Sequence, residues 1–357
     1  MPVVSSPDLG AELAVGTGFL FMLGLYTAPA VLGLVIEPIV LAWSDYLDRR
    51  RLLVWSLHGM SLFLVLCALA PGMLWLSVFF GIWGVFVGIA DGVAQGALVV
   101  DTAEPEREMT RWTLSAAMGD LFAPILIALL AGVGLGWRAA LLVAAAFSFV
   151  TALRVARMTI EVKEEEEEEE ELPPIREALR EALRTPRLFA WLVAVASCTL
   201  TDELLLTLVA VRVDGQGTFG SVQIFSLMLG GVLGLAVTER ALNRFSPRRI
   251  LIAAALLSGL SLVLWVLAPG GAPGVLLLFL LGAADSLHYP FAKARAYAAM
   301  PGRPGLVNAL DKVVGSSELL APLAIGAAVS GWGLEAALLL LLLQPLCIGA
   351  VALIFRR

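Results

Sequence analysis

A carboxylate, an imidazole and a phenol lie close together in one apolar segment of the sequence. Asp285, His288 and Tyr289 are spaced i, i+3 and i+4, so a helix would place all three on one face. Such a set can bind a polar substrate or pass a proton. The alternative for His288 is a structural hydrogen bond near one end of the segment.

A second carboxylate lies in the apolar segment 73–100. Asp91 is one helical turn before Gln95. Glycines run beside them at i, i+4 spacing: Gly84, Gly88, Gly92 and Gly96. Because such a stripe lets another helix approach closely, we interpret it as a packing surface and Asp91 as a candidate binding group.

Other apolar segments also carry polar stripes. One consists of Thr199, Glu203 and Thr207, with Asp202 beside it. Another consists of Asn308, Asp311, Lys312 and Ser316. An unpaired buried ammonium is costly, so we expect Lys312 to pair with a carboxylate.

Three more acidic residues belong to this group. Asp120 and Glu318 each lie a few residues before an Ala-Pro pair. Glu37 precedes Pro38, which is expected to kink its helix. We expect Glu37 to pair with another helix rather than to contact substrate.

The acidic groups in the apolar segments outnumber the basic ones. A charge at the bilayer centre costs at least about 2.5–3.5 kcal/mol, so each is a functional candidate. Burial disfavours the charged form of a carboxylic acid, and some of these groups could therefore take up and release protons. This favours proton coupling or a cationic substrate over an anionic one.

The elements that position these residues are membrane-spanning helices. Of the 357 residues, 59% are hydrophobic and 15% are charged, and the mean hydropathy is +0.90. The apolar segments reach about 20 residues, the length needed to cross the hydrocarbon core as helix. Alternating strand patterns are absent, so we predict an all-α polytopic membrane protein.

Several classes of function have no support in the sequence. The net charge of −6 comes from the run Glu164–Glu171, so it does not indicate a basic partner. No feature of the sequence favours binding to nucleic acid. The three cysteines lie in apolar segments with no metal-binding or disulfide spacing. Because no nucleophile–base set or nucleotide-binding loop occurs, we expect no cofactor, no enzyme and no ATP-driven pump.

Hydropathy predicts eleven spans. They are 19–43, 52–70, 73–100, 113–133, 138–156, 188–211, 221–241, 250–268, 273–292, 306–330 and 334–354. Basic residues concentrate in alternate loops, including the tail Arg356-Arg357, and the other loops are nearly bare of them. By the positive-inside rule the basic loops and the C-terminus are cytoplasmic.

The chain divides into two predicted bundles, 1–157 and 188–357, around a cytoplasmic linker, 158–187. The Glu164–Glu171 run in the linker is expected to be a solvated spacer, with ion binding or regulation as the alternative. A short amphipathic helix, Ile175 to Arg184, follows Pro173-Pro174 and is expected to lie against the membrane or the base of the protein.

The two bundles resemble each other in sequence. Positions 120 and 318 fall in matching segments 198 residues apart, and the same offset pairs Arg50-Arg51 with Arg248-Arg249. A slightly shorter offset pairs Asp91 with Asp285. Long repeats in apolar chains are typical of transporters, whose site lies between two similar halves.

The repeat also predicts an incomplete first helix. The partner of the segment 188–211 would begin before Met1, so residues 2–13 resemble the outer end of a helix. We therefore expect most of the first helix to be lacking. The alternative is an eleven-span protein with an exterior N-terminus.

The loop 41–51, Leu-Ala-Trp-Ser-Asp-Tyr-Leu-Asp-Arg-Arg-Arg, resembles the loop signature of the major facilitator superfamily. Asp45, Arg49 and Arg50 take the acidic and basic positions of that signature, and Arg248 and Arg249 take the basic positions of its second-half echo. The resemblance implies two six-helix bundles related by pseudo-two-fold symmetry. It also implies that these five residues gate the cytoplasmic side, with a topology anchor as the alternative.

Drug–proton antiporters of this superfamily offer a finer comparison. Gln95-Gly96 match the end of their R-x-x-Q-G pattern, but Gly92 stands at the Arg position. The segment Gly119–Pro124 resembles their G-x-x-x-G-P, with Ala123 for the second Gly.

The sequence therefore predicts a secondary active transporter that moves a small solute across the cytoplasmic membrane, as a monomer, by alternating access. We expect proton-coupled efflux. The alternatives are a symporter or uniporter for a polar metabolite, and a membrane sensor or scaffold without transport.

Overall fold

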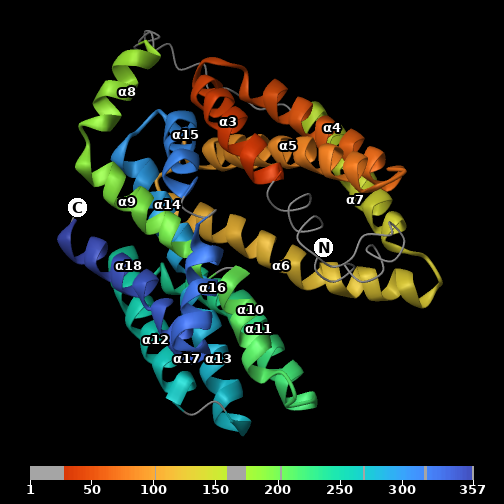
Figure 1. Ribbon diagram of the computed structural model, residues 1–357. Coiled ribbons are helices and arrows are strands. Elements are labelled where there is room, and N and C mark those ends of the chain that lie inside the picture. Colours follow the sequence, from red (N-terminus) through yellow and green to blue (C-terminus); the bar gives the residue numbers. More distant parts are fainter. Residues whose placement is uncertain are drawn as a thin grey trace. The chain divides into compact units, whose positions relative to one another are not determined.

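The computed structural model describes residues 28–100, 102–158, 174–201, 203–267, 270–316 and 320–355. All of the described elements are helical (Figure 1). The first part of the chain forms α3 (Ala28–Trp43), η2 (Ser44–Tyr46), α4 (Arg49–Ala68), α5 (Met73–Val99), α6 (Pro105–Gly132), α7 (Trp137–Arg157) and α8 (Ile175–Leu183). The second part forms α9 (Pro186–Ser197), η3 (Cys198–Leu200), α10 (Glu203–Val213), α11 (Thr218–Ala241), α12 (Pro247–Leu267), α13 (Gly271–Asp285), α14 (His288–Ala299), α15 (Pro304–Val314), α16 (Ala321–Trp332), α17 (Leu334–Leu340) and α18 (Leu343–Ile354).

Nine stretches of the described chain are long and apolar enough to cross a membrane. They are Arg49–Ala68, Met73–Val99, Pro105–Gly132, Trp137–Arg157, Pro186–Val213, Thr218–Ala241, Pro247–Leu267, Gly271–Ala299 and Leu334–Ile354. Each corresponds to one predicted span. The two other predicted spans, 19–43 and 306–330, run partly through residues outside the described ranges. Residues 2–13, the expected remainder of the first helix, lie entirely outside them.

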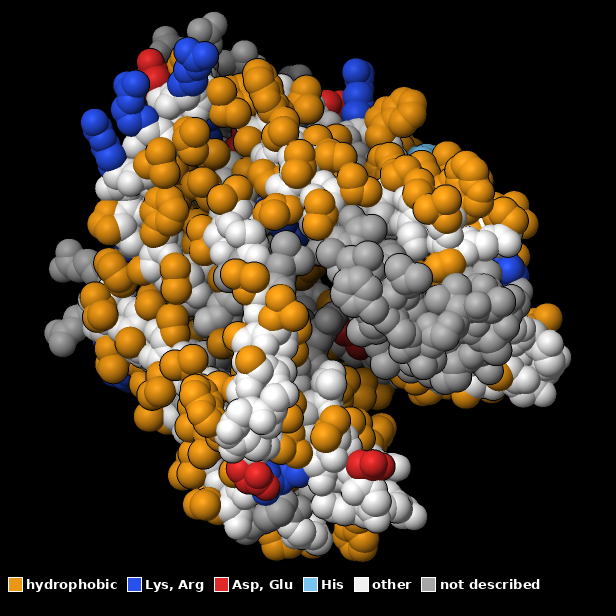
Figure 2. All heavy atoms as spheres, viewed as in Figure 1, with side chains coloured by type: hydrophobic (Ala, Val, Ile, Leu, Met, Phe, Trp, Pro, Cys, Tyr) orange, Lys and Arg blue, Asp and Glu red, His pale blue; other side chains and the backbone are white. Residues whose placement is uncertain are grey.

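Apolar side chains are also abundant on the surface. Leu74, Phe147 and Leu267 are 74–76% exposed. Figure 2 shows hydrophobic side chains over much of the visible face. Water would disfavour such a surface and hydrocarbon would not, which agrees with the predicted all-α membrane protein.

The chain packs as two compact units, and these do not follow the order of the sequence. Among the described residues, unit 1 comprises 28–97, 122–184 and 303–313, and unit 2 comprises 98–121, 185–302 and 314–355. The segment 303–313, late in the chain, thus packs with the first helices. The predicted bundles 1–157 and 188–357 stay a prediction.

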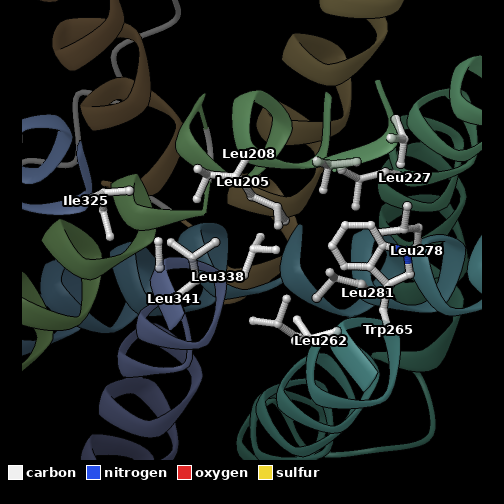
Figure 3. Close-up of a cluster of buried hydrophobic side chains, with 14 of the residues drawn as sticks. Leu205, Leu208, Leu227, Leu262, Trp265, Leu278, Leu281, Ile325, Leu338 and Leu341 are labelled. Carbon is white, nitrogen blue, oxygen red and sulfur yellow. The ribbon is translucent and has the colours of Figure 1, made fainter. Parts of the chain in front are cut away.

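Each unit has its own apolar core. In unit 1, Leu41, Val85, Ile89 and Val93 surround Ala309 of α15. In unit 2, a larger cluster includes the fully buried Trp265 (Figure 3). The indole of that tryptophan donates to the amide oxygen of Gln223 at 3.0 Å, which satisfies its buried N–H.

The predicted amphipathic linker helix is confirmed as α8. Ala178 and Ala182 are buried, whereas Leu179 and Leu183 are exposed. The two alanines of α8 therefore pack against the protein. The two leucines do not, and they are available for contact with another surface.

Candidate functional site

A half-buried ion pair joins α3 to α15 in unit 1. The Nζ atom of Lys312 lies 2.9 Å from Oε2 of Glu37, whose side chain is 8% exposed. Both expected pairings, of Lys312 with a carboxylate and of Glu37 with another helix, are confirmed. Asp91 and Asp311 add electrostatic attraction to the same ammonium. The cluster of Glu37, Asp91, Asp311 and Lys312 is called the lysine cluster below.

The glycine stripe of α5 makes room for this pair. A Cβ atom on Gly88 would lie 2.1 Å from Cδ of Glu37, and one on Gly92 would lie 2.6 Å from Cδ2 of Leu41. At Gly96 the nearest atom would be Cβ of Pro304, at 3.2 Å. The packing interpretation is thus confirmed at these three glycines, because α3 and α15 both lie directly on them.

Asp91 and Gln95 form a hydrogen bond on the same helix. The Nε2 atom of Gln95 donates to Oδ2 of Asp91 at 2.7 Å, and Gln95 is buried. One turn away, Nδ2 of Asn308 donates to the carbonyl of Gly92 at 2.7 Å. The polar stripes on α5 and α15 therefore meet each other, beside the lysine cluster.

A separate network surrounds His288 in unit 2. Nδ1 of His288 lies 3.1 Å from Oδ1 of Asp285, and Nε2 of Gln344 lies 3.0 Å from both atoms. Nε2 of His288 lies 3.5 Å from the hydroxyl of Ser258, and Thr201 donates to the amide oxygen of Gln344. These five residues are called the histidine network below.

The histidine network can hold a proton in more than one place. If Nδ1 carries the proton, it donates to Asp285; if Nδ1 is bare, it accepts from Gln344. The imidazolium form would donate from both nitrogens, to Asp285 and Ser258. His288 is fully buried, so both of its ring nitrogens depend on these side chains for hydrogen bonds.

A break in the backbone positions this network. Helix α13 ends at Asp285 and α14 begins at His288, with a turn between them. A second break, at 341–342, comes just before Gln344. Sequence reasoning missed Gln344, Ser258 and Thr201, although an amide inside the apolar run 334–354 was a visible signal for the first. Tyr289 is half-buried on α14.

Asp45 caps the N-terminus of α15. Its two carboxylate oxygens accept from the backbone N–H groups of Gly305 at 2.8 Å and Leu306 at 2.9 Å. Burial raises the pKa of the Asp45 carboxyl, against the lowering effect of these two donors and of the Arg49 and Arg303 guanidiniums. Arg49 lies 3.3 Å from the same carboxylate.

Arg303 and Tyr46 add a second contact between the same two elements. The guanidinium of Arg303 donates to the Tyr46 hydroxyl at 2.6 Å and lies 5.5 Å from the centre of its ring. The loop after α3 therefore holds the first turn of α15. The loop signature pointed to Asp45 and Arg49, but no signal in the sequence indicated Tyr46.

Arg50 and Arg248 make equivalent contacts in the two units. Arg50 donates to the carbonyls of Val155 and Ala156 at the end of α7. Arg248 donates to the carbonyls of Ala352 and Leu353 at the end of α18. Each arginine satisfies carbonyl groups that a helix C-terminus leaves unpaired. The gating role expected for these two stays a prediction.

Two of the remaining candidates, Asp120 and Arg249, belong to neither cluster. Asp120 is exposed on α6. Arg249 is exposed on the first turn of α12. Asp202, Glu318 and the side chain of Glu203 lie outside the described residues. No group of three or more His, Cys, Asp or Glu side chains that could hold a metal occurs among the residues described here.

Comparison with family models shows the family of the chain. The model described as Major Facilitator Superfamily matches residues 1–317. The chain belongs to the major facilitator superfamily. It is therefore a multi-pass membrane protein and a secondary transporter rather than an enzyme. A search of curated proteins found no match.

Solved structures of the superfamily share this fold at low sequence identity. The Escherichia coli fucose:proton symporter FucP is 16% identical, with 94% of this chain and 90% of that chain covered and a TM-score of 0.74. The proton:xylose symporter XylE is 11% identical, with coverages of 100% and 91% and a TM-score of 0.76. The human organic anion transporter MFSD10 is 17% identical, with coverages of 97% and 88% and a TM-score of 0.72. At these identities the likeness concerns the fold.

Proposed function

We propose that this major facilitator protein couples solute movement to protons, with the lysine cluster as the proton-binding site. The observation that carries the proposal is the charge balance of that cluster. One ammonium, Lys312, pairs with the carboxylate of Glu37 and is also attracted by the carboxylates of Asp91 and Asp311. With all groups ionised the cluster would carry a net negative charge inside the membrane, which is unfavourable unless a proton or another cation neutralises it.

The histidine network is proposed as a second proton-binding site or as a polar contact for the solute. Its side chains can accept or lose a proton with a change of hydrogen-bond partner and no loss of connectivity. Such a site responds to protonation without leaving a buried polar group unpaired. Proton movement between the two sites is not required by the proposal.

We further propose efflux by proton exchange as the direction of transport. Gln95-Gly96 match the antiporter pattern, but Gly92 occupies its Arg position, and Leu41 packs against Gly92. Lys312 from α15 supplies a cation near Asp91 instead. The second candidate is symport, since FucP and XylE are named as proton symporters.

Asp45 and Arg49 are proposed to act as the gate. The carboxylate holds the first turn of α15 through two backbone hydrogen bonds, and α15 also carries Lys312. Release of that turn would move the lysine away from Glu37. Opening of the gate would therefore be coupled to the charge state of the cluster.

Transport in proteoliposomes tests the proposal. Vesicles with internal pyranine, at equal pH inside and outside, receive fucose, xylose or a lipophilic cation outside. Exchange makes the interior more alkaline as solute enters, symport makes it more acidic, and uniport leaves the pH unchanged. A scaffold moves no labelled solute at all.

The variants Glu37→Gln, Asp91→Asn and Asp285→Asn locate the proton site. We expect the first two to abolish coupled proton flux, and Asp285→Asn to do so if the histidine network also binds protons. Asp214→Asn removes an exposed carboxylate outside the spans and is the matched control. Unchanged proton flux in Glu37→Gln and Asp91→Asn would reject the lysine cluster as the coupling site.

A further inference from the structure

A large apolar groove lies on unit 2, and no residue of either polar cluster lines it. Its volume is about 530 Å³, within the usual range for small-ligand sites. Helix α13 forms the floor, with α11 and α12 packed on it. The groove remains between these two helices.

Small residues create the space. Gly234, Ala253, Ala254, Ala283 and Ala284 line the groove. A Cβ atom on Gly234 would lie 2.3 Å from the carbonyl oxygen of Ala283, so α11 approaches the floor closely at this point. Larger side chains at the alanines would fill the groove.

The groove is open on its rim. Leu233, Val237 and Leu257 line it and are 43%, 62% and 39% exposed, whereas Ala254 of α12 and Ala284 of α13 are nearly fully buried. The floor and the two walls belong to helices of membrane-spanning length. Lipid is the medium around the exposed apolar side chains of membrane-spanning helices, so we expect acyl chains to be the molecules that reach this groove.

One end of the groove carries a cation. Arg249, on the first turn of α12, lines it together with Phe245 and Ile250. Among the described residues its exposed guanidinium makes no hydrogen bond or ion pair. The positive-inside pattern predicts that this end lies at the cytoplasmic leaflet, where anionic lipids attract basic residues.

The internal repeat shows that this arginine differs from its counterpart. Arg50 and Arg248 keep the same carbonyl contacts in the two units. Arg51, the counterpart of Arg249, pairs with Asp48 at 3.1 Å, but position 246 holds serine where the repeat would place an acid. The second unit thus retains the cation and lacks its internal partner.

We propose that the groove binds one acyl chain of an anionic phospholipid, whose phosphate pairs with Arg249. The side-by-side arrangement of a lipid-facing apolar groove and an unpaired guanidinium fits an amphiphile with a negative head group. This assigns Arg249 to lipid binding in place of the gate. The proposal does not depend on the mode of transport.

Lipid titration of purified, delipidated protein tests the proposal by native mass spectrometry. Phosphatidylglycerol and phosphatidylcholine with identical acyl chains are compared at the tightest site. We expect the wild type to bind phosphatidylglycerol about fivefold more tightly, because its head group carries a net negative charge near Arg249 and that of phosphatidylcholine does not. Arg249→Gln should remove this preference, and Arg249→Lys should keep most of it. Ala253→Phe fills the groove and should remove the tight site for both lipids.

Two matched controls accompany these variants. Arg51→Gln changes the paired counterpart, and Leu256→Phe adds bulk to an exposed position of α12 that does not line the groove. Both should bind as the wild type does, and circular dichroism establishes that each variant is folded. Equal affinity of the wild type for both lipids, a preference retained in Arg249→Gln, or tight binding retained in Ala253→Phe would each overturn the proposal. Displacement of the lipid by inorganic phosphate alone would also overturn the proposal. It would show that the groove does not contribute to the affinity for the lipid.

Discussion

At the scale of single residues, the buried charges of this transporter are held by partners that differ in kind. Lys312 is held by an opposite charge, Asp45 mainly by backbone N–H groups, and His288 by neutral and acidic side chains. The consequences of removing one partner therefore differ. Loss of an ion-pair partner leaves a charge in the membrane, whereas loss of an amide leaves a hydrogen bond unmade.

The variant Lys312→Met is expected to destabilise the protein by about 1–3 kcal/mol, because it leaves the Glu37 carboxylate without its cation. The cost is less than for a fully buried pair, since the Lys312 side chain is 40% exposed. The double variant Lys312→Met/Glu37→Gln should recover most of the loss. Thermal unfolding in detergent measures both, with Glu104→Gln as an exposed ion-pair control. A double variant no more stable than Lys312→Met would show that the pair does not balance charge.

The stability of Asp45→Asn relative to the wild type is expected to depend on pH. Since burial raises the folded-state pKa of Asp45 above 3.8, its contribution to stability is complete below that pH and is lost as the pH rises through the folded-state pKa. The amide has no such loss. The melting temperature of Asp45→Asn minus that of the wild type should therefore increase as the pH rises from 3.8 through the folded-state pKa of Asp45. Asp214→Asn should show no such trend. A decreasing difference would mean that the backbone donors and Arg49 outweigh burial.

At the scale of elements, glycines decide which helices can meet. On α5, the stripe admits the side chain of Glu37; in unit 2, Gly230, Gly234 and Gly282 bring the backbones of α11 and α13 together. A side chain can move away from an added methyl group, but a helix backbone cannot do so without moving the whole element. The two glycine sets therefore tolerate substitution differently.

Alanine substitutions test this difference. Gly282→Ala places a Cβ atom 2.0 Å from the backbone oxygen of Leu227 and is expected to cost at least about 2–3 kcal/mol. Gly88→Ala should cost less in stability but should displace the Glu37 carboxylate and impair proton coupling. Gly326→Ala meets no atom within 4 Å and should be neutral or stabilising by up to about 1 kcal/mol. Melting temperatures give the order, and equal effects at all three positions would contradict it.

Helix breaks are the second contribution of the elements. The turn between α13 and α14 lets Asp285 and His288 approach the same atom of Gln344. In an uninterrupted helix, Asp285 and His288 would share one face, as their spacing predicts. That spacing does not show that Gln344 of α18 contacts both side chains. The break at 341–342 supplies the matching end of α18.

At the scale of the whole molecule, the membrane sets the distribution of charge along the chain. Basic loops alternate with loops that lack basic residues, which predicts that the loop around Glu104 is cytoplasmic and the loop around Asp214 is exterior.

Labelling of single cysteines tests this orientation. On a background without Cys67, Cys198 and Cys347, Asp214→Cys should react with a membrane-impermeant maleimide in intact cells. Glu104→Cys should react only after permeabilisation. Both positions are exposed, so accessibility within the protein does not separate them. Reaction of Glu104→Cys in intact cells would reverse the orientation, and with it the leaflet assigned to Arg249.

The sequence by itself determined the membrane class, nine spans of the described chain, and the superfamily, because hydropathy, segment length and a loop signature are local properties. It also indicated that Lys312 needs a carboxylate, since the cost of an unpaired charge does not depend on the fold. Only the tertiary structure decided that Glu37 is that partner, that Asp45 caps α15, and that Gln344 joins His288. These contacts join residues from 56 to more than 250 positions apart, and the packing of helix faces that creates them leaves no periodic signal in the sequence.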